Sequence, residues 1–148
     1  MYDRISKSNS MIVLCDWDRG TGKNYTEAIL IKNKININSI TNFILIGFSL
    51  PCGTVCRVLE ENLKKVFDEN YEVKRLVYNK IIITHIPTNT IVARILTSCN
   101  SENIRGEKCD YIICDEYLPS SKELNHRLAF TDFKQIYIFG TFGIDYIK

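Results

Sequence analysis

Residues 11–24 read MIVLCDWDRGTGKN, and they decide how the rest of the chain is interpreted. The first five residues are apolar and rich in β-favouring side chains, which is typical of a buried strand. Polar and glycine residues take over from Asp16 to about Lys23, which predicts a loop. From Lys23 to Lys32, apolar residues lie among good helix formers. The stretch therefore predicts a strand, a glycine loop and a helix in direct succession.

The glycine loop has the residue types of a phosphate-binding loop (P-loop). Such a loop uses glycines to turn backbone N–H groups toward an anion, a lysine to reach the β- and γ-phosphates, and a helix N-terminus behind them. The matching residues are Gly20, Thr21, Gly22 and Lys23. The pattern Gly-x-x-x-x-Gly-Lys-Ser/Thr is broken twice, because Trp17 replaces the first glycine and Asn24 replaces the hydroxyl residue that usually holds Mg²⁺. The alternative interpretation is a glycine turn with a solvated lysine.

A second apolar run, Tyr111 to Cys114, ends in the acidic pair Asp115-Glu116. A nucleotide triphosphatase needs a carboxylate at the end of a neighbouring strand to hold Mg²⁺, and often a second carboxylate to orient the attacking water. By itself such a pair is more often a solvated loop before a helix, where acidic residues are common. Together with the glycine loop, the pair predicts a site for ATP and Mg²⁺.

The remaining apolar runs alternate between strand and helix patterns. Strands are expected at Asn42 to Phe48, Tyr71 to Tyr78 and Gln135 to Gly140, helices after Pro51 and from Ser120 to about Phe130, and a β-hairpin from Ile81–Ile86 and Thr90–Thr97 around Pro87-Thr88-Asn89. The predicted fold class is α/β. We expect a P-loop NTPase of the RecA/ASCE-like type, with a mostly parallel sheet flanked by helices and an inserted β-hairpin.

Length and composition limit the possibilities. The 148 residues suit one domain, residues 1–148, that buries a single core. A net charge of +2 permits a nucleic-acid partner without indicating one. The six cysteines lack zinc-knuckle spacing and are interpreted as reduced thiols: Cys15, Cys52, Cys56, Cys99, Cys109 and Cys114. With no signal peptide and no membrane-spanning run, a cytoplasmic location with no membrane partner is expected.

Two further residues are candidates for the predicted site. Arg19, inside the loop, is placed to stabilise charge on a transferring phosphoryl group or to reach a neighbouring subunit's nucleotide, and its alternative is a surface salt bridge. Thr141, just past the last strand, is a candidate sensor of the γ-phosphate, although a strand-end threonine usually only forms a turn. His85 and His126 lack partners at catalytic or metal-ligand spacing and are interpreted as structural.

The ordered series of motifs resembles the ATPase domain of phage terminase large subunits, the motors that pump DNA into capsids. The series runs over about residues 11–143 and consists of RGTGK, FILIGFSLPCGTVCRVLEENL, the hairpin, Asn103-Ile104-Arg105-Gly106, YIICDEY and FGTFG. The resemblance implies that Arg19 and Lys23 engage phosphates, Asp115 binds Mg²⁺ and Glu116 activates water. It also implies that Thr141 couples hydrolysis to DNA movement, and that the partners are double-stranded DNA and other motor subunits.

Alternatives remain open at this point. A helicase-like P-loop translocase shares the loop and the acidic pair, but lacks the Arg105-Gly106 step. A degenerate remnant that binds nucleotide without hydrolysing it is a third possibility, because Asn24 offers only an amide oxygen to a metal. Thr26, two residues past the expected position, is an alternative to Asn24 as the ligand of Mg²⁺.

Overall fold

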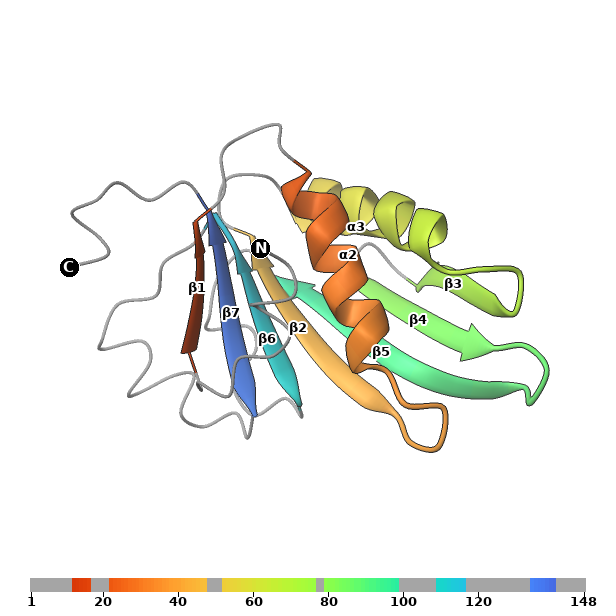
Figure 1. Ribbon diagram of the computed structural model, residues 1–148. Helices are drawn as coiled ribbons and strands as arrows, with labels where there is room; N and C mark the ends of the chain where they lie inside the picture. The colour runs from red at the N-terminus through yellow and green to blue at the C-terminus, as the bar shows by residue number, and fades with distance from the viewer. Residues whose placement is uncertain are drawn as a thin grey trace.

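A computed structural model describes residues 12–16, 22–47, 52–76, 79–98, 109–116 and 134–140 (Figure 1). The elements of this part of the chain are β1 (Ile12–Asp16), α2 (Lys23–Lys34), β2 (Thr41–Gly47), α3 (Cys52–Val66), β3 (Tyr71–Leu76), β4 (Lys80–His85), β5 (Thr90–Ser98), β6 (Tyr111–Asp115) and β7 (Gln135–Gly140). From β1 to α3 their order confirms the alternation of strands and helices expected from the sequence. The helix expected from Ser120 to Phe130 lies outside the described residues.

The strands form one sheet of seven, in the order β1-β7-β6-β2-β5-β4-β3. The first five strands in this order are parallel, while β4 pairs antiparallel with both β5 and β3. The expected mostly parallel sheet is therefore confirmed. The expected hairpin is also present, as β4 and β5, and it extends the main sheet because β5 pairs with β2 and β3 adds a further antiparallel strand at the edge.

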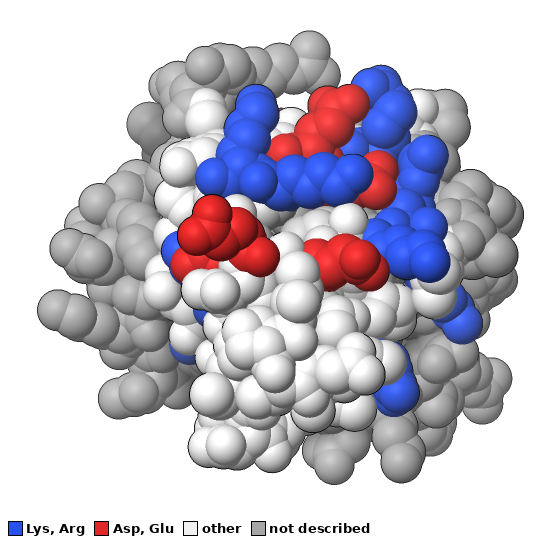
Figure 2. Space-filling view, turned by 90° about the vertical axis from the view of Figure 1, so that its right-hand side faces the viewer, with Lys and Arg blue, Asp and Glu red and all other residues white. Residues whose placement is uncertain are grey.

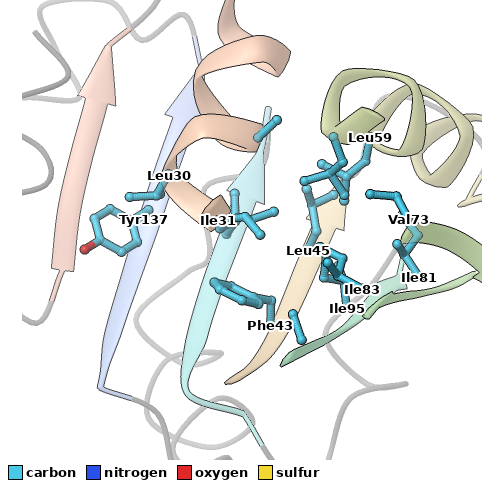
Figure 3. Packing of buried hydrophobic residues seen from close by; sticks show 14 of the residues in the cluster. Leu30, Ile31, Phe43, Leu45, Leu59, Val73, Ile81, Ile83, Ile95 and Tyr137 are labelled. Carbon is cyan, nitrogen blue, oxygen red and sulfur yellow. The ribbon is translucent and has the colours of Figure 1, made fainter. Parts of the chain in front are cut away.

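The central strands β2, β6 and β7 are buried on both faces, which explains why they read as continuous apolar runs. In β2, Phe43 and Leu45 belong to the cluster that packs against α2 and α3, whereas Ile44 and Ile46 belong to a second cluster with β6 and β7. Figure 3 shows Leu30 and Ile31 of α2 and Leu59 of α3 directed toward the sheet. Both helices therefore cover the same face of the sheet.

The cysteines of the described part are consistent with the expected reduced state. Cys15, Cys56, Cys109 and Cys114 are buried thiols rather than disulfides. Burial raises the pKa of the Cys15 and Cys109 thiols to about 12, so these groups stay protonated and unreactive at neutral pH. No helix in the described part of the chain is long and apolar enough to cross a membrane.

The charges on the outer surface are mixed. Figure 2, turned by 90° from Figure 1, shows Lys and Arg intermingled with Asp and Glu in its upper part and a stretch without charge below. Ion pairs of this kind join Arg57 to Glu61 (3.0 Å) and Lys64 to Glu60 (3.4 Å) along α3, and Arg75 of β3 also reaches Glu60 (3.7 Å). Glu60 is half-buried and the other partners are more exposed, so these surface pairs contribute little stability, but they interrupt the basic surface on this face.

Candidate nucleotide site

The carboxyl ends of the parallel strands meet along one edge of the sheet. Asp16 of β1 pairs with Gly140 of β7, and Asp115 of β6 lies opposite both Phe139 of β7 and Gly47 of β2. In open α/β sheets, ligands bind outside this edge. Strand β7 separates β1 from β6, so the carboxyl ends of β1 and β6 lie on either side of the end of β7.

Gly47 allows α3 to approach this edge closely. A Cβ atom added to Gly47 would lie 2.9 Å from Cγ2 of Val55, which is closer than side chains tolerate. Helix α3 therefore packs directly against the end of β2, beside the strand that carries Asp115. This contact closes one side of the edge with apolar side chains.

Helix α2 begins where the glycine loop predicted it. Gly22 precedes the helix with φ +83°, a left-handed conformation that glycine adopts without strain. Lys23 is the first helical residue, and no acidic residue lies in the first turn. The positive end of the helix dipole thus stays available to an anion, as a phosphate-binding loop requires.

The acidic pair is held by the neighbouring strand. Glu116 has φ +55°, an unusual value for a glutamate, and its backbone N–H donates a hydrogen bond to the carbonyl of Phe139 (2.7 Å). Strand β6 ends at Asp115, so the turn at Glu116 directs two successive carboxylates to the same edge. Strain of this kind is concentrated at functional positions.

Lys23 lies between the two carboxylates. Its amino group donates a hydrogen bond to Oε1 of Glu116 (2.8 Å) and lies 2.6 Å from Oδ1 of Asp115. The three side chains are only 15%, 15% and 21% exposed for Lys23, Asp115 and Glu116. The fold thus brings together three of the residues that the sequence singled out, across 93 residues of chain between Lys23 and Glu116.

Burial and charge act in opposite directions on these groups. Burial raises the pKa of Asp115, although its contact with Lys23 partly offsets the effect. Burial alone would lower the pKa of Lys23, but the hydrogen bonds and charges of Asp115 and Glu116 outweigh it, so this pKa is raised. Lys23 therefore stays charged at neutral pH, and its charge stabilises the two carboxylates.

The two alternatives for the Mg²⁺ ligand after Lys23 differ in the structure. The hydroxyl of Thr26 is buried and donates a hydrogen bond to the carbonyl of Gly22 (3.0 Å), inside the helix. Asn24 instead lines a small cavity of about 20 Å³ together with Asp115. The geometry therefore favours Asn24 over Thr26 as a neighbour of the acidic pair.

The donors at this edge fit Mg²⁺ in chemistry and number. Mg²⁺ prefers oxygen ligands and is usually held by one or two carboxylates, with waters and substrate phosphates completing its shell. Asp115 supplies a carboxylate, and Oδ1 of this residue has no hydrogen-bond partner beyond its contact with Lys23. Within the described ranges, no group of three or more His, Cys, Asp or Glu side chains encloses a metal by itself. A site completed by a nucleotide is therefore the appropriate kind.

Several predicted site residues lie outside the described part of the chain. They are Arg19, Gly20, Thr21, Thr141 and the Arg105-Gly106 step. A larger hollow, of about 250 Å³, lies between β2, β5, β4 and β3 and is lined by none of the predicted site residues. The cavity lined by Asn24 and Asp115 has the lesser volume, but it adjoins the charged side chains and is therefore the one relevant to the site.

Glu27 was not singled out from the sequence, yet it lies beside the site. It is 1% exposed, lines the small cavity with Asn24 and Asp115, and its Oε2 atom has no hydrogen-bond partner among the described residues. Helical periodicity contained a signal, because Glu27 lies four residues after Lys23 and four before the apolar Ile31. Glutamate is rarely buried without a partner, so an acidic residue on the buried face of a helix indicates a binding or catalytic site.

The sequence matches no protein-family model and no curated protein. A variant of the Thermus phage P74-26 large terminase ATPase domain superposes with a TM-score of 0.63 at 17% identity, over 97% of this chain and 65% of that one. The large terminase of a second, thermophilic bacteriophage, in complex with ADP, gives 0.65 at 17% identity, over 93% and 37%. The Phi-28 gp11 DNA packaging motor gives 0.50 at 10% identity, over 95% and 49%.

The shared structure extends over nearly the whole chain, while the chain spans 65% or less of the length of each of these three proteins. The low identities mean that the likeness concerns the fold. The seven-stranded, mostly parallel sheet with two helices agrees with it. The chain thus has the fold of the ATPase domains of phage large terminases.

Proposed function

We propose that this chain is the Mg²⁺-dependent ATP-hydrolysing domain of a viral DNA-packaging motor. The observation that carries the proposal is the contact of Lys23 with Asp115 and Glu116 at the carboxyl edge of the sheet. A lysine at a helix N-terminus opposite two carboxylates is the charge arrangement that phosphoryl transfer from a nucleotide requires. The ADP held by the large terminase of the thermophilic bacteriophage supports the choice of nucleotide.

Each residue of the cluster has a distinct part in the proposed reaction. The triphosphate competes with Asp115 and Glu116 for the amino group of Lys23, which moves to the phosphate oxygens. This exchange frees Glu116 to accept a proton from the attacking water. Asp115 and Asn24 are the residues that would hold Mg²⁺ through their oxygens, and a bound ion would supply positive charge beside the phosphates.

The roles of Arg19 and Thr141 extend the proposal beyond the described residues. The resemblance assigns Arg19 to the phosphates and Thr141 to the coupling of hydrolysis with DNA movement. Gly140, the last residue of β7, pairs with Asp16 of β1, and Thr141 is the next residue in the sequence. Neighbouring motor subunits are further proposed partners, as the packaging motor with this fold suggests.

Double-stranded DNA is the proposed substrate of the movement. Exposed cations for it are present on the antiparallel part of the sheet, where the register places Lys74 of β3 and Arg94 of β5 on either side of Ile82 and Lys80 in the next row. Phosphate contacts of this kind give affinity that falls with salt. Replacing Lys80 and Arg94 by alanine is expected to weaken DNA binding and to reduce its salt dependence, with ATP binding unchanged.

The decisive experiment compares ATP binding and phosphate release for the wild type, Lys23→Ala and Glu116→Gln. Lys23→Ala is expected to weaken ATP binding by at least about 30-fold, the equivalent of roughly 2 kcal/mol, because it removes the positive charge that would pair with the phosphates. Glu116→Gln is expected to slow hydrolysis by about 10²- to 10⁴-fold and to keep affinity within about threefold, since the amide cannot accept the proton.

Lys32→Ala and Glu69→Gln are matched controls, because both side chains are exposed and lie away from the cluster. Both controls should behave as the wild type. Equal ATP binding by the wild type and Lys23→Ala would eliminate the nucleotide site. Tight binding without hydrolysis in the wild type would instead favour the degenerate remnant.

A further inference from the structure

Glu27 is difficult to explain as a packing residue. Its side chain is buried on the face of α2 that packs against the sheet, where leucine or isoleucine would be stable. A buried carboxyl group without a hydrogen-bond partner costs free energy, and such groups require an explanation in native structures. Departures from local rules of this kind are found where function requires them.

The surroundings of Glu27 point to the nucleotide site. The small cavity is lined by three polar residues, Asn24, Glu27 and Asp115, and by the apolar side chains of Leu45, Val55, Val58 and Leu59. Two buried oxygens of these polar residues, Oε2 of Glu27 and Oδ1 of Asp115, are left without a hydrogen-bond partner among the described residues, apart from the ion pair of Asp115 with Lys23. The cavity volume of about 20 Å³ is enough for one water molecule, and its lining offers the two to four polar partners that a buried water needs.

We propose that Glu27 is a positioning residue of the nucleotide site, and that its carboxyl group holds Asn24 and Asp115 in place through one water molecule in this cavity. The proposal rests on the proposed function, because Asn24 and Asp115 are its Mg²⁺-binding residues. It also accounts for the asparagine at position 24, since an amide is longer than a serine hydroxyl group and needs a fixed orientation to present its oxygen. Replacing a group that hydrogen-bonds to a metal ligand and orients it commonly changes metal affinity by about 10- to 100-fold.

The test is a comparison of Glu27→Leu, Glu27→Gln and wild type. The dissociation constant of ATP-γ-S is measured with MgCl₂ and with EDTA, and the ratio gives the magnesium-dependent gain in affinity. Glu27→Leu is expected to lower this gain by about tenfold and to leave the EDTA value within about threefold. Glu27→Gln keeps a polar group of the same shape and is expected to retain the gain.

A melting curve separates this role from a structural one. Glu27→Leu is expected to melt at or above the temperature of the wild type, because it replaces an unpaired buried carboxyl group with an apolar side chain. A structural role gives the opposite result: Glu27→Leu melts lower, and affinity falls equally with and without magnesium. Leu59→Met, which alters only the apolar wall of the same cavity, is the control and should retain the wild-type gain.

Different results would overturn the proposed function and the role of Glu27. A wild-type protein that does not bind ATP-γ-S under either condition would overturn both the proposed function and the role of Glu27. A wild-type protein with a magnesium-dependent gain that Glu27→Leu fully retains would overturn the role of Glu27 alone. Loss of the gain in Glu27→Gln as well as in Glu27→Leu, with both variants melting lower, would also overturn it.

Discussion

Asn89 and Glu116 have almost the same unusual backbone conformation, with φ of +52° and +55°, but in two different regions of the molecule. Asn89 lies in the turn between β4 and β5, where its N–H donates a hydrogen bond to the carbonyl of Ile86 (3.0 Å). Asparagine adopts this conformation readily, so the turn is specified by its own residues. Glutamate does not, and Glu116 is held by Phe139 of β7 and by Lys23 of α2.

The difference extends to the regions around the two residues. The β4–β5 turn is held by local contacts, such as those of the Thr88 hydroxyl with Nδ1 of His85 and with the Thr90 hydroxyl, both 2.7 Å. The carboxyl edge depends on charged groups that come from distant segments and are partly buried. We therefore expect the hairpin region, β4 and β5 with the turn between them, to contribute most to stability. At the carboxyl edge we expect stability to be reduced in favour of function.

The largest expected effect tests the hairpin region. Ile83 is fully buried and pairs with Val73 of β3 and Ala93 of β5. Ile83→Ala should lower the free energy of unfolding by about 2–5 kcal/mol, because it leaves a cavity in the core. Urea unfolding measures the loss, and ATP affinity below the transition should be that of the wild type. A loss below about 1 kcal/mol would contradict the assignment of stability to this region.

The next effect concerns the pH dependence of stability at the carboxyl edge. Burial, and then the charge of Asp115, raise the pKa of Glu27 well above 4.5, while Lys23 opposes and Glu116 adds to the shift. The folded state thus holds its proton more tightly than the unfolded state, and the contribution of Glu27 to stability is fully present below about pH 4.5 and is lost as the pH rises toward its folded pKa.

Glu27→Gln removes this titration. The variant should be more stable than the wild type by about 1–3 kcal/mol at about pH 8, because its amide is buried without a charge, and the difference should shrink toward about pH 4.5. Urea unfolding at several pH values measures it. A difference that is constant with pH would show that the carboxyl group of Glu27 does not titrate in this range.

A smaller effect is expected at Glu116. Glu116→Gly should raise the free energy of unfolding by about 0.5–1 kcal/mol, because glycine adopts a positive φ without a steric penalty. The same change should abolish hydrolysis, since the carboxylate is lost. The measurement combines thermal unfolding with phosphate release. Lower stability in this variant would mean that the contact with Lys23 contributes more than the backbone strain costs.

The smallest effect is expected at Asn89, as the matched position. Asn89→Gly should change the free energy of unfolding by no more than about 0.5 kcal/mol, because asparagine already suits the turn. Thermal unfolding beside Glu116→Gly gives the comparison directly. Equal gains at both positions would remove the distinction between a locally specified turn and one held by tertiary contacts.

The sequence predicted most of the described helices and strands, and it singled out three residues that the fold brings together, Lys23, Asp115 and Glu116. The start of α2 after Gly22, the strand that ends in Asp115-Glu116 and the turn around Asn89 were identified because periodicity, glycine and turn chemistry are properties of neighbouring residues. The missed residue, Glu27, lay on a helix whose buried face the pattern defined only weakly, since its apolar positions were few. A polar residue among them did not stand out, although the fold buries it.

The sequence by itself determined the strand at residues 12–16, the helix that begins at Lys23, the strand that ends in the acidic pair and the hairpin, because backbone hydrogen bonding and side-chain alternation act over a few residues. Only the tertiary structure decided that β7 lies between β1 and β6, that Lys23 meets Asp115 and Glu116, and that Glu27 is buried behind them. These arrangements depend on which strands pair and which faces pack, and the free energies of those contacts are shared by residues far apart in the chain.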